Sequence, residues 1–85
     1  MFIEQLLAEI ITEFNLRHEN YAGELTALHD GKDLVLQFHG ITDTIPLPDG
    51  STFYESAEVG AIWLMVTDGF VKMIEIYERE EREDL

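Results

Sequence analysis

The sequence has no cysteine and few basic residues, with five lysines and arginines in a chain of 85 residues. Without cysteine there is no disulfide, no thiolate nucleophile and no metal site built on sulfur. The 18 aspartates and glutamates therefore leave a formal net charge of −13. A surface of that sign repels the phosphates of nucleic acids and of anionic lipids, so we expect no direct binding to nucleic acid and no binding to a membrane.

Long apolar runs and targeting signals are absent as well. No stretch of the sequence is long enough in apolar residues to span a membrane as a helix. The apolar N-terminal segment contains Glu4, Glu9 and Glu13 and has no basic region, unlike a secretory signal peptide. We therefore expect a soluble, cytoplasmic protein.

Motifs for catalysis, metal binding and cofactor binding are also missing. The sequence has no glycine-rich phosphate loop and no serine in a nucleophile-elbow context. Asp49-Gly50 followed by Glu55 is only a fragment of a calcium loop. His29 and His39 fall far apart along the predicted first hairpin, so they cannot form a metal site by themselves. We predict that the protein is not an enzyme and holds no metal and no cofactor.

The length and composition fit one folded domain. Hydrophobic residues make up 46% of the chain, which is normal for a folded protein. We assign residues 1–78 to a single α+β domain. Residues 79–85 are a run of charged side chains and are predicted to form an acidic C-terminal tail.

Residues 2–16 show the clearest helical pattern in the sequence. Apolar side chains recur three and four residues apart and form one broad stripe, made of Phe2, Ile3, Leu6, Leu7, Ile10, Ile11 and Phe14. Polar and acidic residues occupy the other side, as in a helix that packs on a sheet.

Residues 21–39 are predicted to form a first β-hairpin. Asp30-Gly31 between two alternating runs indicates a two-residue turn. That turn places Leu25 opposite Leu36 and gives one apolar face. The other face is mostly polar and consists of Glu24, Thr26, Asp33, Val35, Gln37 and His39.

The middle of the chain is punctuated by proline and glycine. Residues 41–47 are predicted to form a short edge strand, because proline is tolerated at a sheet edge, and residues 48–50 a turn. Two interpretations stay open for the segment that follows. A capping box from Thr52 to Glu55 favours a short helix over residues 53–59, whereas a strand fits residues 52–56 as well.

Residues 60–78 form the densest apolar segment, and the predicted fold depends on them. β-branched residues and the sequence Thr67-Asp68-Gly69 favour a second hairpin, with Gly69 in a left-handed conformation. The alternative is a helix over residues 70–82, because the apolar residues there also fit one side of a helix. With the hairpin, the fold class is α+β, with an N-terminal helix packed on a four- to five-stranded antiparallel sheet built from two hairpins.

The predicted second hairpin has an apolar outer face in addition to its core face. The outer face carries Trp63, Met65, Val71, Met73 and Tyr77. A single folded chain seldom leaves such a patch bare, and these residue types are common at binding surfaces. We expect another chain or residues 53–59 to cover this face.

The charge and the outer face together favour a small acidic protein-binding module. Such a module would inhibit a basic partner protein that binds nucleic acid, in the manner of a DNA mimic or of an immunity or anti-defence protein. The predicted partner-binding residues are Glu24, Asp33, Asp43, Asp49, Trp63, Met65, Met73 and Tyr77.

Two alternatives belong to other functional classes. The first is a homo-oligomeric structural or accessory domain, in the simplest case a homodimer, whose interface contains Trp63 and whose charge only aids solubility. The second is a ligand-binding module with a pocket between the helix and the sheet.

Overall fold

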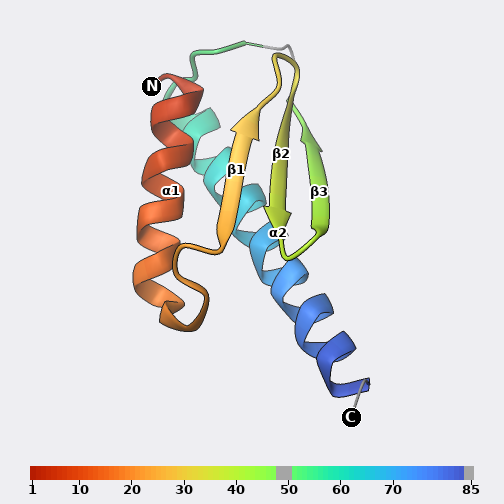
Figure 1. The fold of residues 1–85 in the computed structure, drawn as a ribbon. Coiled ribbons are helices and arrows are strands. Elements are labelled where there is room, and N and C mark those ends of the chain that lie inside the picture. The colour runs from red at the N-terminus through yellow and green to blue at the C-terminus, as the bar shows by residue number, and fades with distance from the viewer. Residues whose placement is uncertain (48–50, 84–85) are drawn as a thin grey trace.

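The computed structural model describes the backbone of residues 1–47 and 51–83 and the side chains of those residues up to residue 80. The elements in chain order are α1 (Ile3–Arg17), a short 3-10 helix η1 (Glu19–Tyr21), β1 (Leu25–His29), β2 (Asp33–Phe38), β3 (Ile41–Pro46) and α2 (Ser56–Glu83). The strands form one antiparallel sheet in the order β1-β2-β3, and α1 and α2 cover the same face of it (Figure 1). The α+β class is therefore confirmed. The predicted four to five strands are not, because the described residues form three.

Helix α1 confirms the predicted N-terminal helix to within one residue at each end. Its buried stripe consists of Ile3, Leu6, Leu7, Ile10 and Phe14. No side chain caps its first turn. Instead, the Ile3 nitrogen donates to the Thr52 carbonyl at 2.8 Å, which satisfies one of the free N–H groups at the helix start.

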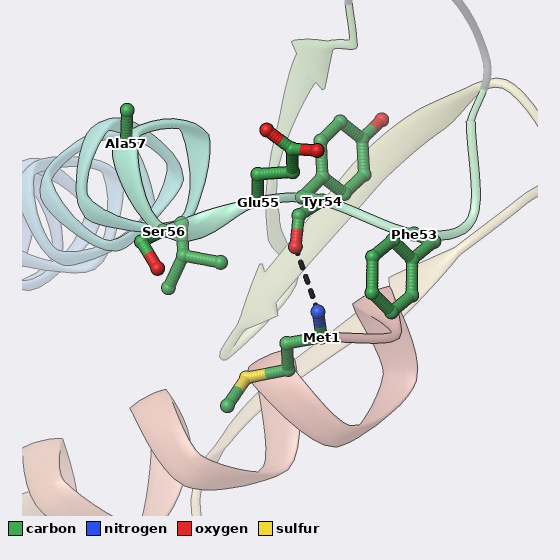
Figure 2. A pocket seen from close by; sticks show the side chains of 7 residues that line it. Met1, Phe53, Tyr54, Glu55, Ser56 and Ala57 are labelled. Atoms are coloured by element: carbon green, nitrogen blue, oxygen red, sulfur yellow. Dashed lines mark hydrogen bonds between the residues drawn. The ribbon is translucent and has the colours of Figure 1, made fainter.

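The segment before α2 pairs with the first residues of the chain. The Met1 nitrogen donates to the Tyr54 carbonyl at 2.7 Å, and the Tyr54 nitrogen donates back to the Met1 carbonyl at 2.9 Å (Figure 2). Phe2 and Phe53 form an isolated antiparallel bridge, and helix α2 begins at Ser56. Residues 52–55 are therefore neither the predicted strand nor the start of a capped helix, and residues 56–59 are the first turn of the long helix α2 instead of a separate short helix.

The first hairpin forms, but its register differs from the prediction by two residues. Leu25 pairs with Phe38 instead of Leu36, because the turn is centred one residue later, on Gly31-Lys32. Gly31 takes the left-handed backbone there, with φ +98°. A shift of two residues keeps every side chain on its predicted face, so the apolar face still points to the core.

Strand β3 confirms the predicted edge strand, since β2 is its one neighbour among the strands that the structure describes. His39 and Gly40 join the two strands, both with positive φ (48° and 80°), as in the tight turns favoured in hairpins. Leu36 pairs with Asp43, so Asp43 lies on the helix-facing side of the sheet. The predicted turn over residues 48–50 lies outside the described residues.

The predicted second hairpin over residues 60–78 is wrong, and the helical alternative is confirmed. Residues 56–83 form the single long helix α2, which starts earlier than the predicted residue 70 and includes most of the predicted tail. Its side chains in the core are Ile62, Val66, Phe70, Met73 and Ile74. Gly69 is a buried helical residue whose φ is not positive, so its predicted left-handed conformation is also wrong.

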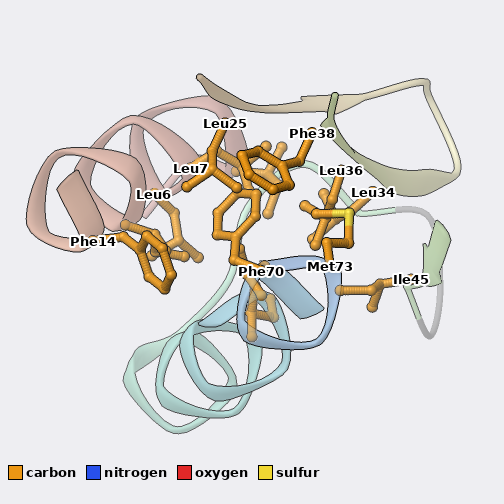
Figure 3. Close-up of a cluster of buried hydrophobic side chains, with 14 of the residues drawn as sticks. Leu6, Leu7, Phe14, Leu25, Leu34, Leu36, Phe38, Ile45, Phe70 and Met73 are labelled. Atoms are coloured by element: carbon orange, nitrogen blue, oxygen red, sulfur yellow. The ribbon is translucent and has the colours of Figure 1, made fainter. Parts of the chain in front are cut away.

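The core fills the space between the helices and the sheet (Figure 3). Within it, Phe14 of α1 and Phe70 of α2 are in contact, with ring centroids 5.2 Å apart. Leu34, Leu36 and Phe38 of β2 are each no more than 1% exposed, and β2 packs against α2. The molecule is therefore a two-layer sandwich, with one outer surface made by helices and the other by the open side of the sheet.

Candidate protein-binding surface

The predicted acidic residues do not form one row. Glu24 and Asp33 lie on the open side of the sheet at opposite ends of the first hairpin, and Asp43 lies on its helix-facing side. The Glu24 carboxylate lies 2.6 Å from Nε2 of His39, so this carboxylate already has a hydrogen-bond partner within the chain. Asp49 lies outside the described residues.

The predicted apolar outer face is not a single surface either, because it depended on the hairpin. Met73 is 2% exposed and belongs to the core. Tyr77 stacks on His39, with ring centroids 4.5 Å apart. Met65 is 40% exposed, and Trp63 is half-buried against the core beside α1. Trp63 thus lies beside α1, where it and residues of α1 line one depression.

The open sheet face has an uncharged centre. Its side chains lie in two rows across the three strands: Thr26, Gln37 and Thr42 in one row, and Leu28, Val35 and Thr44 in the other. Leu28 is 48% exposed. Among the residues that the structure describes, carboxylates border this face at its ends alone, so the face offers little electrostatic attraction to a basic partner.

The two helices, by contrast, present many exposed carboxylates. On α1 and α2 these are Glu4, Glu9, Glu58, Asp68, Glu75 and Glu80. Among the described side chains, the only ion pairs closer than 4 Å are Arg17–Glu13 and His39–Glu24. The exposed helix carboxylates therefore have no close cationic neighbour within the described part of the chain.

A shallow depression of about 480 Å³ lies on α1 next to Trp63. We call it the Trp63 depression, and it is lined by Gln5, Ala8, Glu9, Thr12, Glu13, Leu16 and Trp63. Its apolar part consists of Ala8, Leu16 and the indole of Trp63, with Glu9 and Glu13 beside them. Leu16 is 73% exposed, which is high for a large apolar side chain, and Leu64 next to Trp63 is 67% exposed.

Sequence reasoning missed Glu9, Glu13 and Leu16 as binding candidates. One signal was available, since Leu16 lies outside the apolar stripe of a helix whose core positions end at Phe14. A large apolar residue on the polar side of an amphipathic helix is a candidate contact residue.

Other features of the surface have structural explanations. A wider cavity of about 590 Å³ lies beside Met1 and residues 53–59, where the N-terminal segment meets the start of α2 (Figure 2). His39 and Tyr77 pack the turn between β2 and β3 against α2. In the first hairpin, the N–H groups of Asp33 and Lys32 donate to the Asp30 carboxylate and lower its pKa below the ordinary value.

Within residues 1–47 and 51–80 no group of three histidine or acidic side chains is placed to hold a metal ion. Neither described helix is both long and apolar enough to cross a membrane.

No protein-family model matches the chain, and no curated protein or solved structure matches it. The function must therefore be inferred from the charge and geometry of this chain.

Proposed function

We propose that this protein is a small acidic binding module that covers the basic surface of a nucleic-acid-binding partner and thereby inhibits it. The binding surface is the outer side of α1 and α2 around the Trp63 depression. The observation that carries the proposal is the exposed Leu16 and the half-buried Trp63 beside the carboxylates of Glu9 and Glu13. Apolar anchors surrounded by charge are typical of protein interfaces.

The charge explains why a basic partner fits this surface. Proteins that bind nucleic acids do so largely through lysine and arginine contacts to phosphates. Exposed carboxylates attract the same side chains, and a chain of net charge −13 adds long-range attraction at low salt. A partner held here would have its phosphate-binding side chains occupied.

A second copy of this chain fits the same surface poorly. Two copies meeting there would bring Glu9 and Glu13 of one molecule close to those of the other. Like charges that face each other across an interface cost several kcal/mol. A homodimer built on Trp63 is therefore the weaker alternative, and sedimentation equilibrium of the purified chain distinguishes it from a monomer.

Binding kinetics with a partner recovered from lysate test the proposal. We expect the partner to be displaced by duplex DNA, and its association rate to fall as the Debye length shrinks from about 10 Å at 0.1 M salt to about 3 Å at 1 M. Association that is independent of salt, or a partner that binds duplex DNA and this chain together without competition, would contradict inhibition by charge mimicry.

A matched pair of double variants locates the surface. Glu9→Gln with Glu13→Gln removes two charges from the helix side, and Glu24→Gln with Asp33→Asn removes two from the open sheet face. We expect the Glu9→Gln and Glu13→Gln double variant to slow association with the partner about threefold or more. The Glu24→Gln and Asp33→Asn double variant should slow association less. A larger effect of the Glu24→Gln and Asp33→Asn double variant would show that the partner binds the open sheet face instead.

A further inference from the structure

We infer that the Trp63 depression receives a basic amphipathic α-helix of the partner protein. The apolar side of that helix would rest on Ala8, Leu16 and Trp63, and its lysines or arginines would face Glu9 and Glu13. This inference rests on the proposed function and adds to it the kind of structural element that is bound.

The shape of the depression fits a helix. Its lining residues on α1 extend from Gln5 to Leu16, which is about 16 Å along a helix axis. They recur every three or four residues, so they form a strip parallel to that axis. A second helix laid along the strip would pack side chains into it over about three turns, as in helix-in-groove recognition.

The charges follow the same strip. Glu9 and Glu13 are one helical turn apart on α1, so cations one turn apart on a partner helix can reach both. Glu13 now pairs with Arg17 at 2.7 Å, but the side chains of that pair are 44% and 72% exposed. An exposed ion pair of this kind contributes little to stability, so Glu13 can exchange Arg17 for a partner cation.

An extended peptide added to the sheet is the less suitable occupant. At the edge formed by β3, such a peptide would meet Pro46, which ends that strand. Asp43 points from β3 toward the helices, and inward-pointing charges and prolines are features that protect edge strands from further pairing.

Two synthetic peptides of the same composition provide the test. Both contain only lysine, leucine and alanine in about 18 residues, one ordered as an amphipathic helix and the other scrambled so that it has no apolar side. Trp63 is the only tryptophan of the chain, so its fluorescence reports binding at this place. We expect the amphipathic peptide to shift the Trp63 emission and to bind at least about tenfold more tightly than the scrambled one.

Leu16→Gln is the test variant and Leu28→Gln is its matched control. Both leucines are exposed, but Leu28 lies on the open sheet face on the other side of the molecule. We expect Leu16→Gln to weaken binding of the amphipathic peptide about fivefold or more and Leu28→Gln to leave it within about twofold. Circular dichroism confirms that each variant keeps its fold.

The possible outcomes separate this inference from the proposed function. Equal binding of the two peptides would overturn the helix-binding depression and leave an acidic module that recognises charge alone. A larger effect of Leu28→Gln would also overturn it, and would place the apolar contact on the open sheet face. If neither peptide binds at low salt, both the helix-binding inference and the proposed function are overturned.

Discussion

Gly69 lies where α2 crosses β2 and β3. A Cβ at this position would come 2.7 Å from Cδ1 of Leu36 and 3.1 Å from Oδ2 of Asp43. Leu36 is fully buried, so its side chain has little room to move away. The absence of a side chain at residue 69 therefore allows the helix to approach the sheet closely.

We expect Gly69→Ala to destabilise the protein by about 1 kcal/mol. Alanine favours a helix over glycine by about 1 kcal/mol, but overpacking of a buried site costs about 1–3 kcal/mol, so overpacking dominates. The measurement is the free energy of unfolding in urea. Gly60→Ala is the matched control, because Gly60 is helical with open space around it, and it should stabilise by about 0.5–1 kcal/mol. Equal stabilisation by both substitutions would show that α2 does not lie this close to the sheet.

Asp30 holds the turn of the first hairpin through its carboxylate. The N–H of Asp33 donates to Oδ1 at 2.7 Å and that of Lys32 at 3.0 Å, and these bonds lower the pKa of Asp30. A lowered pKa in the folded state means that the unfolded chain binds the proton more tightly. The contribution of Asp30 to stability is therefore complete above its ordinary pKa of about 3.9 and is lost as the pH falls through the lower folded value.

This contribution can be followed by comparing the chain with its Asp30→Ala variant. We expect the variant to be less stable at neutral pH, and the difference between the two to shrink as the solution is acidified. Unfolding curves at a series of pH values provide the measurement. A stability difference that stays constant down to acidic pH would mean that the turn does not depend on the ionised carboxylate.

At the scale of elements, α2 shows why part of the fold could not be predicted. Thr67-Asp68-Gly69 has the composition of a turn, but in α2 Asp68 points to solvent and Gly69 faces the sheet. The glycine is required for close packing between a helix and a sheet, which local sequence does not reveal. β-branched residues such as Val66 and Ile74 also favoured a strand, and tertiary packing overrode that preference.

The elements with a clear period were predictable. The stripe of α1 repeats every three to four residues, and the first hairpin alternates cleanly, so both were found with their faces correct. The predicted turn of the first hairpin lay one residue too early, because the sequence does not show whether Asp30-Gly31 forms the centre of the turn or its beginning. For the candidate surface, composition predicted the acidity, but the apolar contacts depended on the hairpin and were therefore misplaced.

The second half of α2 is held to the sheet by an aromatic cluster. Tyr77 stacks on His39 and contacts Phe38 edge-on with ring centroids 5.2 Å apart. We expect Tyr77→Ala to destabilise by about 2 kcal/mol, because it removes a half-buried ring from these contacts. Hydrogen exchange of the amides near residue 77 should also become faster than in the original chain.

The neighbouring Ile76 provides the control for this prediction. It is 42% exposed, so Ile76→Ala should change the free energy of unfolding by less than about 0.5 kcal/mol. Similar small effects of both substitutions would indicate that the cluster does not anchor α2.

At the scale of the whole molecule, the two outer surfaces differ in character. The helices carry exposed carboxylates next to exposed apolar side chains, whereas the centre of the open sheet face is uncharged. A net charge of −13 repels a second copy from most approaches and attracts basic proteins over a distance. The proposed function therefore depends on which surface the basic partner contacts.

The most direct test of which surface binds a basic partner is chemical-shift mapping by NMR. It uses the isotope-labelled chain and the unlabelled amphipathic basic peptide. A chain of 85 residues gives well-resolved amide signals, so every part of both surfaces is observed at once. The account predicts that the perturbed amides lie along residues 5–16 of α1 and around Trp63 of α2, with Thr26, Gln37 and Thr42 unchanged. Perturbations centred on those three sheet residues, with α1 unaffected, would contradict the assignment of the binding surface to the helices.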